Sequence, residues 1–428
     1  MPRTTLLPAT LAALALMAAV AAGTATAAPA YVPGELIVKR DGAPASTTVA
    51  VRDGDSVKAA ARELSDRPGV AYARPRDVVR ASAYTPNDPS FPVQWNLATS
   101  AAGINMPEAW GSARRLRRPG GKNVVIAVLD TGVAYQRFRR FRRAPDLNRF
   151  VRGYDFVARD RHPNDQNGHG THVAGTIAQT TGNGIGTAGI AYRARIMPVR
   201  VLDSSGAGDT LAISRGIRYA ARNGADVINL SLEFDASVRA AQIPDIVSAL
   251  RYARRRGALV IAAAGNQGSS QVAYPARARR AVAVAATTAR GCQAEYSNSG
   301  VHVDIAAPGG GVDAANTDTS YDAATCQPDL GGGDFIYQQT FLGSVARFGL
   351  PRGYEGTSMA APHVSGVAAL LIGSRLLGRD PGPAAVERRL EASARDIGAP
   401  GWDPRYGWGL LDAAAALRWD RPTKDLAL

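Results

Sequence analysis

The sequence predicts an α/β fold, a mostly parallel central sheet flanked by helices, preceded by a small α+β unit. After about residue 90, short apolar runs alternate with longer segments of helical periodicity. Apolar residues predominate in each run, as in strands that are buried on both faces of a parallel sheet. The expected strands are 124–129, 196–201, 227–232, 259–264, 281–286 and 303–306. The expected helices are 210–223, 244–256, 383–393 and 406–417, with a long apolar helix after residue 356.

The chain begins with the features of an exported protein. Arg3 precedes an apolar run at 11–22, and small residues at 25–27 end this segment. This is the layout of a secretory signal peptide. The run is shorter than the ~20 apolar residues that cross a bilayer. We therefore expect residues 1–27 to be removed and the mature protein to be secreted, without a membrane span.

Residues 28–83 have a pattern of their own. The pattern predicts strands and one helix, at 34–39, 69–73 and 78–79 for the strands and 57–64 for the helix. A fold of about 55 residues is only marginally stable by itself. A polar, proline-containing joint at 85–89 separates it from the rest of the chain. We therefore expect a removable unit rather than a working module.

Composition limits the classes of function. The 428 residues carry a formal net charge of +14, and arginines cluster at 137–143 and 251–256. No recognisable nucleic-acid module accompanies these clusters, so we interpret them as solvated surface charge and expect no nucleic-acid partner. The two cysteines, Cys292 and Cys326, are too few for a metal site. In an exported protein such a pair is expected to form a disulfide.

Four polar residues lie where an α/β protein collects functional groups. Asp130 and Asn266 each follow an expected strand, so both lie beyond the carboxyl ends of the sheet. His169 lies in Gly-His-Gly-Thr-His-Val-Ala-Gly, and Ser358 lies in Gly-Thr-Ser-Met-Ala before the long apolar helix. Singly, such residues more often form turns and caps. Together they supply a nucleophile, a base, a carboxylate that orients the base and an amide donor for an oxyanion.

In these segments and in their order, the chain resembles the subtilisin family of serine proteases, most closely its thermitase-like branch. The resemblance extends through nearly the whole chain after Tyr84. It implies that Ser358 is the nucleophile, His169 the general base and acid, and Asp130 the orienting carboxylate. It also implies that Asn266 and the Ser358 N–H bind the oxyanion. Peptide bonds would be cleaved through an acyl-enzyme intermediate, without a catalytic cofactor.

The resemblance further implies that the protein is made as a zymogen. Residues 84–89 resemble the mature N-terminus of that branch, and the segment before them resembles the family's inhibitory prodomain. Cleavage after Ala83 would separate prodomain 28–83 from catalytic domain 84–428. The sequence Arg80-Ala81-Ser82-Ala83 then predicts tolerance of small side chains before the scissile bond. We expect a monomer that acts on proteins or peptides and is inhibited by its own prodomain.

Substrate-binding residues are also implied by the resemblance. Two segments would pair with the peptide backbone, Gly206, Ala207 and Gly208 on one side and Ser231, Leu232 and Glu233 on the other. The primary pocket would be lined by Ala263, Ala264, Gly265 and Ala273. Glu233 and Ala273 both stand where the family usually has glycine. The first change is expected to attract basic groups, and the second to make the pocket shallower.

A structural calcium site is the last feature that the resemblance implies. Its ligands would be the side chains of Asp88, Asp146 and Asn183 and the carbonyls of Thr180, Ile185 and Thr187. Carboxylate and carbonyl oxygens together suit Ca²⁺. A second site would use Asp155, Asp160 and Asn164, but Ala158 stands where an acidic ligand is expected. The alternative is that these acidic groups are surface residues that balance nearby arginines.

Other functional classes fit the sequence less well. The α/β-hydrolase esterases carry Gly-x-Ser-x-Gly and the order Ser, acid, His, and this chain shows neither. A catalytically inactive relative used for binding would lack one of the four polar residues, and none is missing. A metal site at His169 and His172 lacks the spacing and the glutamate of zinc proteases. Segment 309–353 fits either a loop that restricts access to the leaving-group side or a tolerated insertion.

Overall fold

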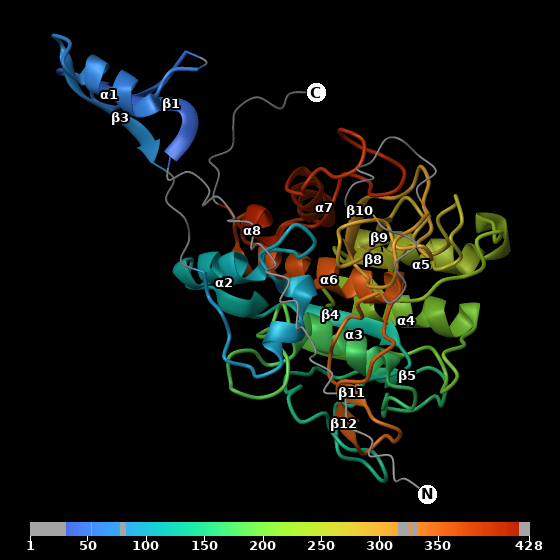
Figure 1. Ribbon diagram of the computed structural model, residues 1–428. Coiled ribbons are helices and arrows are strands. Elements are labelled where there is room, and N and C mark those ends of the chain that lie inside the picture. Colours follow the sequence, from blue (N-terminus) through green and yellow to red (C-terminus); the bar gives the residue numbers. More distant parts are fainter. Residues whose placement is uncertain (1–30, 53, 78–82, 316–325, 327–332, 419–428) are drawn as a thin grey trace, which may run out of the picture. The chain divides into compact units, whose positions relative to one another are not determined.

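The computed structural model describes residues 31–52, 54–77, 83–315, 326 and 333–418. The chain divides into two compact units, residues 1–80 and 81–428 (Figure 1). The expected signal peptide at 1–27 and the expected strand at 78–79 lie outside the described residues. No helix in the part of the chain that the structure describes has the length and apolar character needed to cross a membrane.

The first unit is a three-stranded antiparallel sheet with one helix. Its strand order is β2-β1-β3, with β1 at Tyr31–Arg40, β2 at Thr47–Ala50, β3 at Val70–Asp77 and α1 at Val57–Ser65. Leu36 and Val38 of β1 pack against Val57 and Ala61 of α1 in a small core. The sequence did not predict β2, because all four of its residues are exposed and leave no buried face.

The second unit is built on a seven-stranded parallel sheet, which confirms the predicted α/β class. The strand order is β10-β9-β8-β7-β4-β6-β5. The strands are β4 Val125–Asp130, β5 Tyr154–Asp155, β6 Arg195–Arg200, β7 Val227–Leu230, β8 Leu259–Ala263, β9 Ala281–Thr287 and β10 Ile305–Pro308. Each of the six predicted apolar runs overlaps one of them. The two residues of β5 are too few to give a recognisable apolar run.

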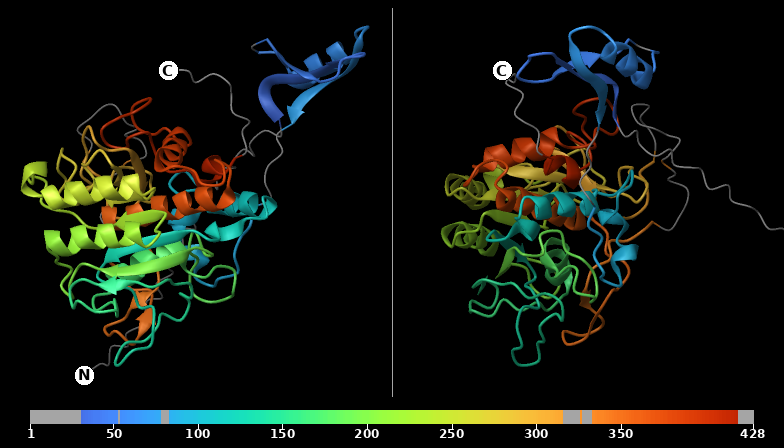
Figure 2. Two further views of the ribbon diagram at one scale, coloured as in Figure 1. Left: turned by 180° about the vertical axis from the view of Figure 1, so that it is seen from behind. Right: turned by 90° about the vertical axis from the view of Figure 1, so that its left-hand side faces the viewer.

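Helices cover both faces of this sheet (Figures 1 and 2). One layer contains α4 and α5, at Thr210–Arg222 and Pro244–Arg255. The other contains α3 and α6, at His169–Ala178 and Thr357–Ser374. Alternate residues of β4 therefore enter different cores. Ile126 and Val128 pack on the α3 and α6 side, whereas Ala127 and Leu129 pack on the α4 and α5 side.

The remaining helices lie at the margins of the second unit, with α2 at Met106–Arg115, α7 at Pro383–Ala392 and α8 at Ala413–Ala416. The predicted helix at 406–417 is wrong in its first half. Asp403 and Gly407 exchange two backbone hydrogen bonds in a tight turn. Gly407 and Gly409 have φ values of 62° and 118°, in the left-handed region that an α-helix does not use.

Segment 309–353 is partly core and partly surface. Ile336 and Gln338 are fully buried. The carbonyl of Ile336 accepts a hydrogen bond from His172 Nε2 at 2.9 Å. Beyond them, β11 (Thr340–Phe341) pairs with β12 (Phe348–Gly349) in a short hairpin. The segment that begins near Ile336 therefore supports the fold, and is more than an insertion on its surface.

The predicted disulfide is confirmed. Cys292 and Cys326 are bonded, with their Cα atoms 5.7 Å apart. Both residues are buried. The bond anchors segment 309–353 to the chain that follows β9, because Cys292 lies just beyond that strand.

Candidate active site

Asp130 and His169 form the best-defined pair of the site. Asp130 is the last residue of β4, and His169 is the first residue of α3. His169 Nδ1 lies 2.7 Å from Asp130 Oδ1, which also accepts the Thr131 N–H at 2.7 Å. The Asp130 side chain is fully buried, whereas 24% of the His169 side chain is exposed. A carboxylate can only accept here, so it fixes the proton on Nδ1 and leaves Nε2 free to act as a base.

The electrostatic surroundings favour the protonated form of His169. Burial by itself lowers the pKa of this imidazole. The charge and the hydrogen bond of Asp130 raise the pKa and outweigh burial, with a further contribution from Asp165. A proton taken up at Nε2 would therefore be stabilised by the buried carboxylate on the opposite side of the ring.

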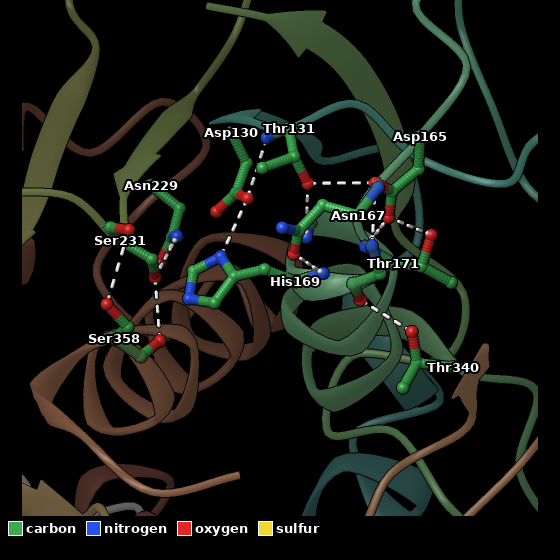
Figure 3. Close-up of polar contacts among 12 residues, drawn as sticks. Asp130, Thr131, Asp165, Asn167, His169, Thr171, Asn229, Ser231, Thr340 and Ser358 are labelled. Carbon is green, nitrogen blue, oxygen red and sulfur yellow. Dashed lines mark hydrogen bonds and ion pairs between the residues drawn. The ribbon is translucent and has the colours of Figure 1, made fainter. Parts of the chain in front are cut away.

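Asp165 holds the turn that presents His169, and the sequence analysis did not identify it. Its buried carboxylate accepts five hydrogen bonds of 2.6–2.9 Å, from the N–H groups of Asn167, Gly168 and Thr171 and the hydroxyls of Thr131 and Thr171 (Figure 3). A carboxylate at this position caps the positive end of α3. The signal available in the sequence was an aspartate four residues before the histidine, outside the usual N-cap position.

A second contact supports the same turn from the other side. Thr340 Oγ1 donates to the Gly168 carbonyl at 2.5 Å. His172, one turn further along α3, donates to Ile336 and stacks on Tyr354 with ring centroids 4.2 Å apart. His172 is buried, and burial lowers its pKa to about 3. The His172 ring therefore serves the packing of α3 and does not converge with His169 on a shared ligand.

Ser358 lies at the N-terminus of α6, after Gly356. The φ of Gly356 is 138°, which a side chain would not tolerate well. Ser358 Oγ donates to the Ser231 carbonyl at 3.3 Å, and Ser231 Oγ donates to the Ser358 carbonyl at 2.8 Å (Figure 3). Among the described residues, no hydrogen bond joins Ser358 Oγ to His169. Such contacts are often absent before substrate binds.

Asn266 is oriented from both ends of its amide. Its Oδ1 accepts the N–H and the hydroxyl of Thr357, at 2.7 and 2.9 Å. Its Nδ2 donates to Glu233 Oε1 at 3.3 Å. Its backbone N–H donates to Glu233 Oε2 at 2.7 Å. Thr357 immediately precedes Ser358, so this network ties Asn266 to the N-terminus of α6.

A cleft of about 500 Å³ brings these residues together. Its walls include His169, Asn266 and Ser358, and also the predicted substrate-binding residues Gly206, Ala207, Gly208, Ser231, Leu232 and Glu233. The predicted pocket residues Ala263, Ala264, Gly265 and Ala273 do not line it and are buried. The carboxyl group of Glu233 and the side-chain amide of Asn298 both lie against Gly265, where a Cβ atom would meet them.

The residues predicted to hold calcium also come together. Asn183 bridges the buried carboxylates of Asp88 and Asp146, through its N–H at 3.3 Å and its Nδ2 at 2.7 Å. The Thr180 N–H donates to the Asp146 carbonyl, and Asn183 Oδ1 accepts the Ile185 N–H. Thr187 is buried, and its hydroxyl donates to Gln338. Within the described residues neither carboxylate is paired with a cationic side chain, so an oxygen-rich site of this kind fits Ca²⁺.

The second predicted calcium site does not fit a metal. Asp155 Oδ2 is paired with Arg200 at 2.9 Å, and both side chains are buried. Asp155 Oδ1 accepts the N–H groups of Val157 and Ala158. The arginine therefore supplies the positive charge that this carboxylate requires.

An aspartate-oriented histidine and a helix-terminal serine, in one cleft of a parallel α/β sheet, define a serine hydrolase. Residues 121–409 match the model of the subtilase family, peptidase S8. The chain therefore belongs to the subtilase family, and it is a subtilisin-like serine protease.

Individual relatives agree with this assignment. The chain is 35% identical over 401 residues to the thermophilic serine proteinase of Bacillus sp. (strain AK1), covering 88% of this chain and 86% of that protein. It is 38% identical over 289 residues to thermitase of Thermoactinomyces vulgaris, covering 67% of this chain and 85% of thermitase. A solved protease from Pseudoalteromonas arctica aligns with a TM-score of 0.63 at 34% identity, covering 78% of this chain and 98% of that one.

The pKa of His169 tests the electrostatic account of the site. We expect the imidazole to titrate above its ordinary value of 6.5, because Asp130 stabilises its charged form. Asp130→Asn removes that charge and should lower the pKa. The measurement is an NMR titration of His169 in a Ser358→Ala background, chosen to avoid self-digestion. Asp396→Asn, an exposed aspartate, is the matched control. A titration that Asp130→Asn leaves unchanged would contradict this account.

Proposed function

We propose that this protein is a secreted serine endopeptidase, made as a self-processing zymogen, with Asp130, His169 and Ser358 as its catalytic triad. The observation that carries the proposal is the buried Asp130–His169 pair, whose imidazole enters the cleft that also contains Ser358. In Figure 3 the His169 ring lies between Asp130 and Ser358. This order is the one that proton transfer from the serine requires.

The chemistry follows from the positions of the donors and acceptors. Ser358 Oγ attacks the substrate carbonyl carbon while His169 Nε2 takes its proton. Asp130 stabilises the imidazolium that results. The tetrahedral intermediate then breaks its C–N bond, and His169 returns the proton to the departing amine. Water, activated by the same imidazole, hydrolyses the acyl-enzyme and restores Ser358.

Two N–H donors would stabilise the oxyanion. The Ser358 N–H lies at the start of α6 and has no acceptor among the described residues. Such unsatisfied groups at a helix N-terminus favour negative charge. The second donor is the Asn266 Nδ2, whose amide is oriented by Thr357. Removing one such side-chain donor typically costs about 3–4 kcal/mol of transition-state stabilisation.

The first compact unit supports the zymogen part of the proposal. It has its own hydrophobic core, and it precedes a joint that begins the second unit. We propose that residues 1–27 direct export and that prodomain 28–83 inhibits the enzyme until the bond after Ala83 is cut. The mature protease then acts on protein or peptide substrates as a monomer.

The Asp88 and Asp146 cluster supports a structural role for calcium. The ion would be held by these carboxylates, by Asn183 and by carbonyls of loop 180–187, and it would neutralise two buried charges. It would fix the loop after α3 and take no part in the chemistry.

Replacement of the nucleophile tests the enzymatic proposal. Ser358→Ala should reduce casein hydrolysis on the order of 10⁶-fold. It should also abolish labelling by a serine-directed covalent inhibitor. The same variant should accumulate as an uncut species that retains the residues before Tyr84, which mass spectrometry would detect. Ser344→Ala, at an exposed serine, is the control and should keep full activity. Wild-type protein that is neither labelled nor active would instead support an inactive binding protein.

Thermal unfolding tests the calcium proposal. In the Ser358→Ala background, a chelator should lower the midpoint, because an ion at 100 times its dissociation constant contributes about 2.7 kcal/mol. Added Ca²⁺, but not Mg²⁺, should restore it. The double variant Asp88→Asn, Asp146→Asn should melt at the same temperature with and without chelator. An unchanged wild-type midpoint would argue against a structural calcium ion.

A further inference from the structure

The Glu233 carboxylate faces the cleft without a positive partner. It is half-buried, and its only hydrogen bonds among the described residues come from the backbone and side-chain N–H groups of Asn266. Within the same residues no lysine, arginine or histidine pairs with it. Burial raises the pKa of Glu233, and the two Asn266 donors oppose this effect. A charged carboxylate that is partly removed from water lowers the stability of the protein unless a cation pairs with it.

The position of this carboxylate coincides with the expected primary pocket. Its Oε2 lies beside Gly265, where a Cβ atom would meet Asn298 Nδ2, Glu233 Oε2 and the Ala273 Cβ. Gly265 and Ala273 are both buried. The Glu233 carboxyl group thus lies between the cleft and Gly265, one of the residues that the resemblance to subtilisins assigns to the pocket. A substrate side chain that enters this space must contact the carboxyl group or move it.

We propose that Glu233 selects the substrate residue immediately before the scissile bond, and that it favours arginine or lysine there. This inference rests on the proposed function, since it concerns the substrate of the same site. The cation missing from the free protein would be supplied by the substrate. Guanidinium and ammonium groups form the strongest hydrogen bonds available to a carboxylate.

Three classes of substrate side chain interact differently with this group. A basic side chain draws the carboxylate away from Asn266 and replaces the lost hydrogen bonds with charge-assisted ones. A small side chain such as alanine leaves Glu233 in place and is tolerated. A large apolar side chain must displace the carboxylate and offers it no donor, which leaves a buried charge unsatisfied.

The contact with Asn266 connects this selection to catalysis. In the free protein the carboxylate accepts from the same Nδ2 that the oxyanion requires. A basic substrate side chain would draw the Glu233 carboxylate away from Asn266 Nδ2 as it binds, and would leave that donor free for the oxyanion. The preference for arginine should therefore appear in kcat as well as in KM.

Three peptides that differ only in the residue before the scissile bond test the proposal. With alanine, arginine or phenylalanine there, wild-type enzyme should show the highest kcat/KM for arginine, about tenfold above the others. Rates are normalised to active sites, counted with the serine-directed inhibitor. This count separates a poor substrate preference from an inactive enzyme.

Two substitutions at Glu233 separate charge from volume. Glu233→Gln keeps the side-chain size and removes the charge, so the arginine advantage should fall about tenfold while phenylalanine stays poor. Glu233→Gly empties the pocket, so phenylalanine should improve and arginine should lose its advantage. Asp235→Asn is the matched control, because among the described residues this exposed carboxylate accepts hydrogen bonds from Ser237 alone. Its arginine-to-phenylalanine ratio should equal that of the wild type.

Specific results would overturn the assignment. A labelled, active wild type that prefers phenylalanine, or an arginine advantage that survives in Glu233→Gln, would refute the role of Glu233 and leave the protease proposal intact. Absence of both labelling and cleavage would refute the proposed function and this inference with it. Should Glu233→Gly fail to fold in a thermal melt, the isosteric Gln variant alone decides the question.

Discussion

The hydrogen bond between Asp130 and His169 is the interaction on which the site depends. It joins the end of central strand β4 to the start of α3, and its carboxylate is completely buried. Both flanking cores hold β4 in place, and Asp165 with Thr340 fixes the turn before His169. The fold therefore places one oriented imidazole in a cleft whose walls also include Asn266 and Ser358. The end of a rigid strand is suited to holding this imidazole, because small displacements of a catalytic group greatly reduce the reaction rate.

In the free protein, Ser358 and Asn266 are not yet arranged for the proposed reaction. Ser358 bonds to Ser231 and Asn266 bonds to Glu233, so the proposed nucleophile and the proposed oxyanion donor both have local partners. Substrate must exchange these contacts for its own. We expect this exchange to discriminate among peptides. A substrate side chain that donates hydrogen bonds to Glu233 loses less binding free energy than one that does not. The two proposals therefore predict that selectivity and catalysis are coupled through the Glu233 carboxylate.

Much of this architecture could be predicted from the sequence. Short, mainly apolar runs located the strands. Asp130 and Asn266 follow two of them, so their position at one edge of the sheet could be predicted. Asp165 was not found, because a buried capping aspartate looks like any loop aspartate until its five donors are seen. The turn at Gly407 was assigned to a helix because its apolar neighbours hid two left-handed glycines. The side chains of Glu233 and Asn298, distant in sequence, meet at Gly265, and no local pattern specifies that contact.

The most direct test of the account is a crystal structure of the enzyme with a phosphonate inhibitor on its serine. We predict a covalent bond to Ser358 Oγ, with the phosphoryl oxygen about 2.7–3.1 Å from both Asn266 Nδ2 and the Ser358 N–H. His169 should keep its bond to Asp130, with Nε2 facing the modified oxygen. An adduct on another serine would contradict the account. So would a phosphoryl oxygen directed to solvent while Asn266 remains bound only to Glu233.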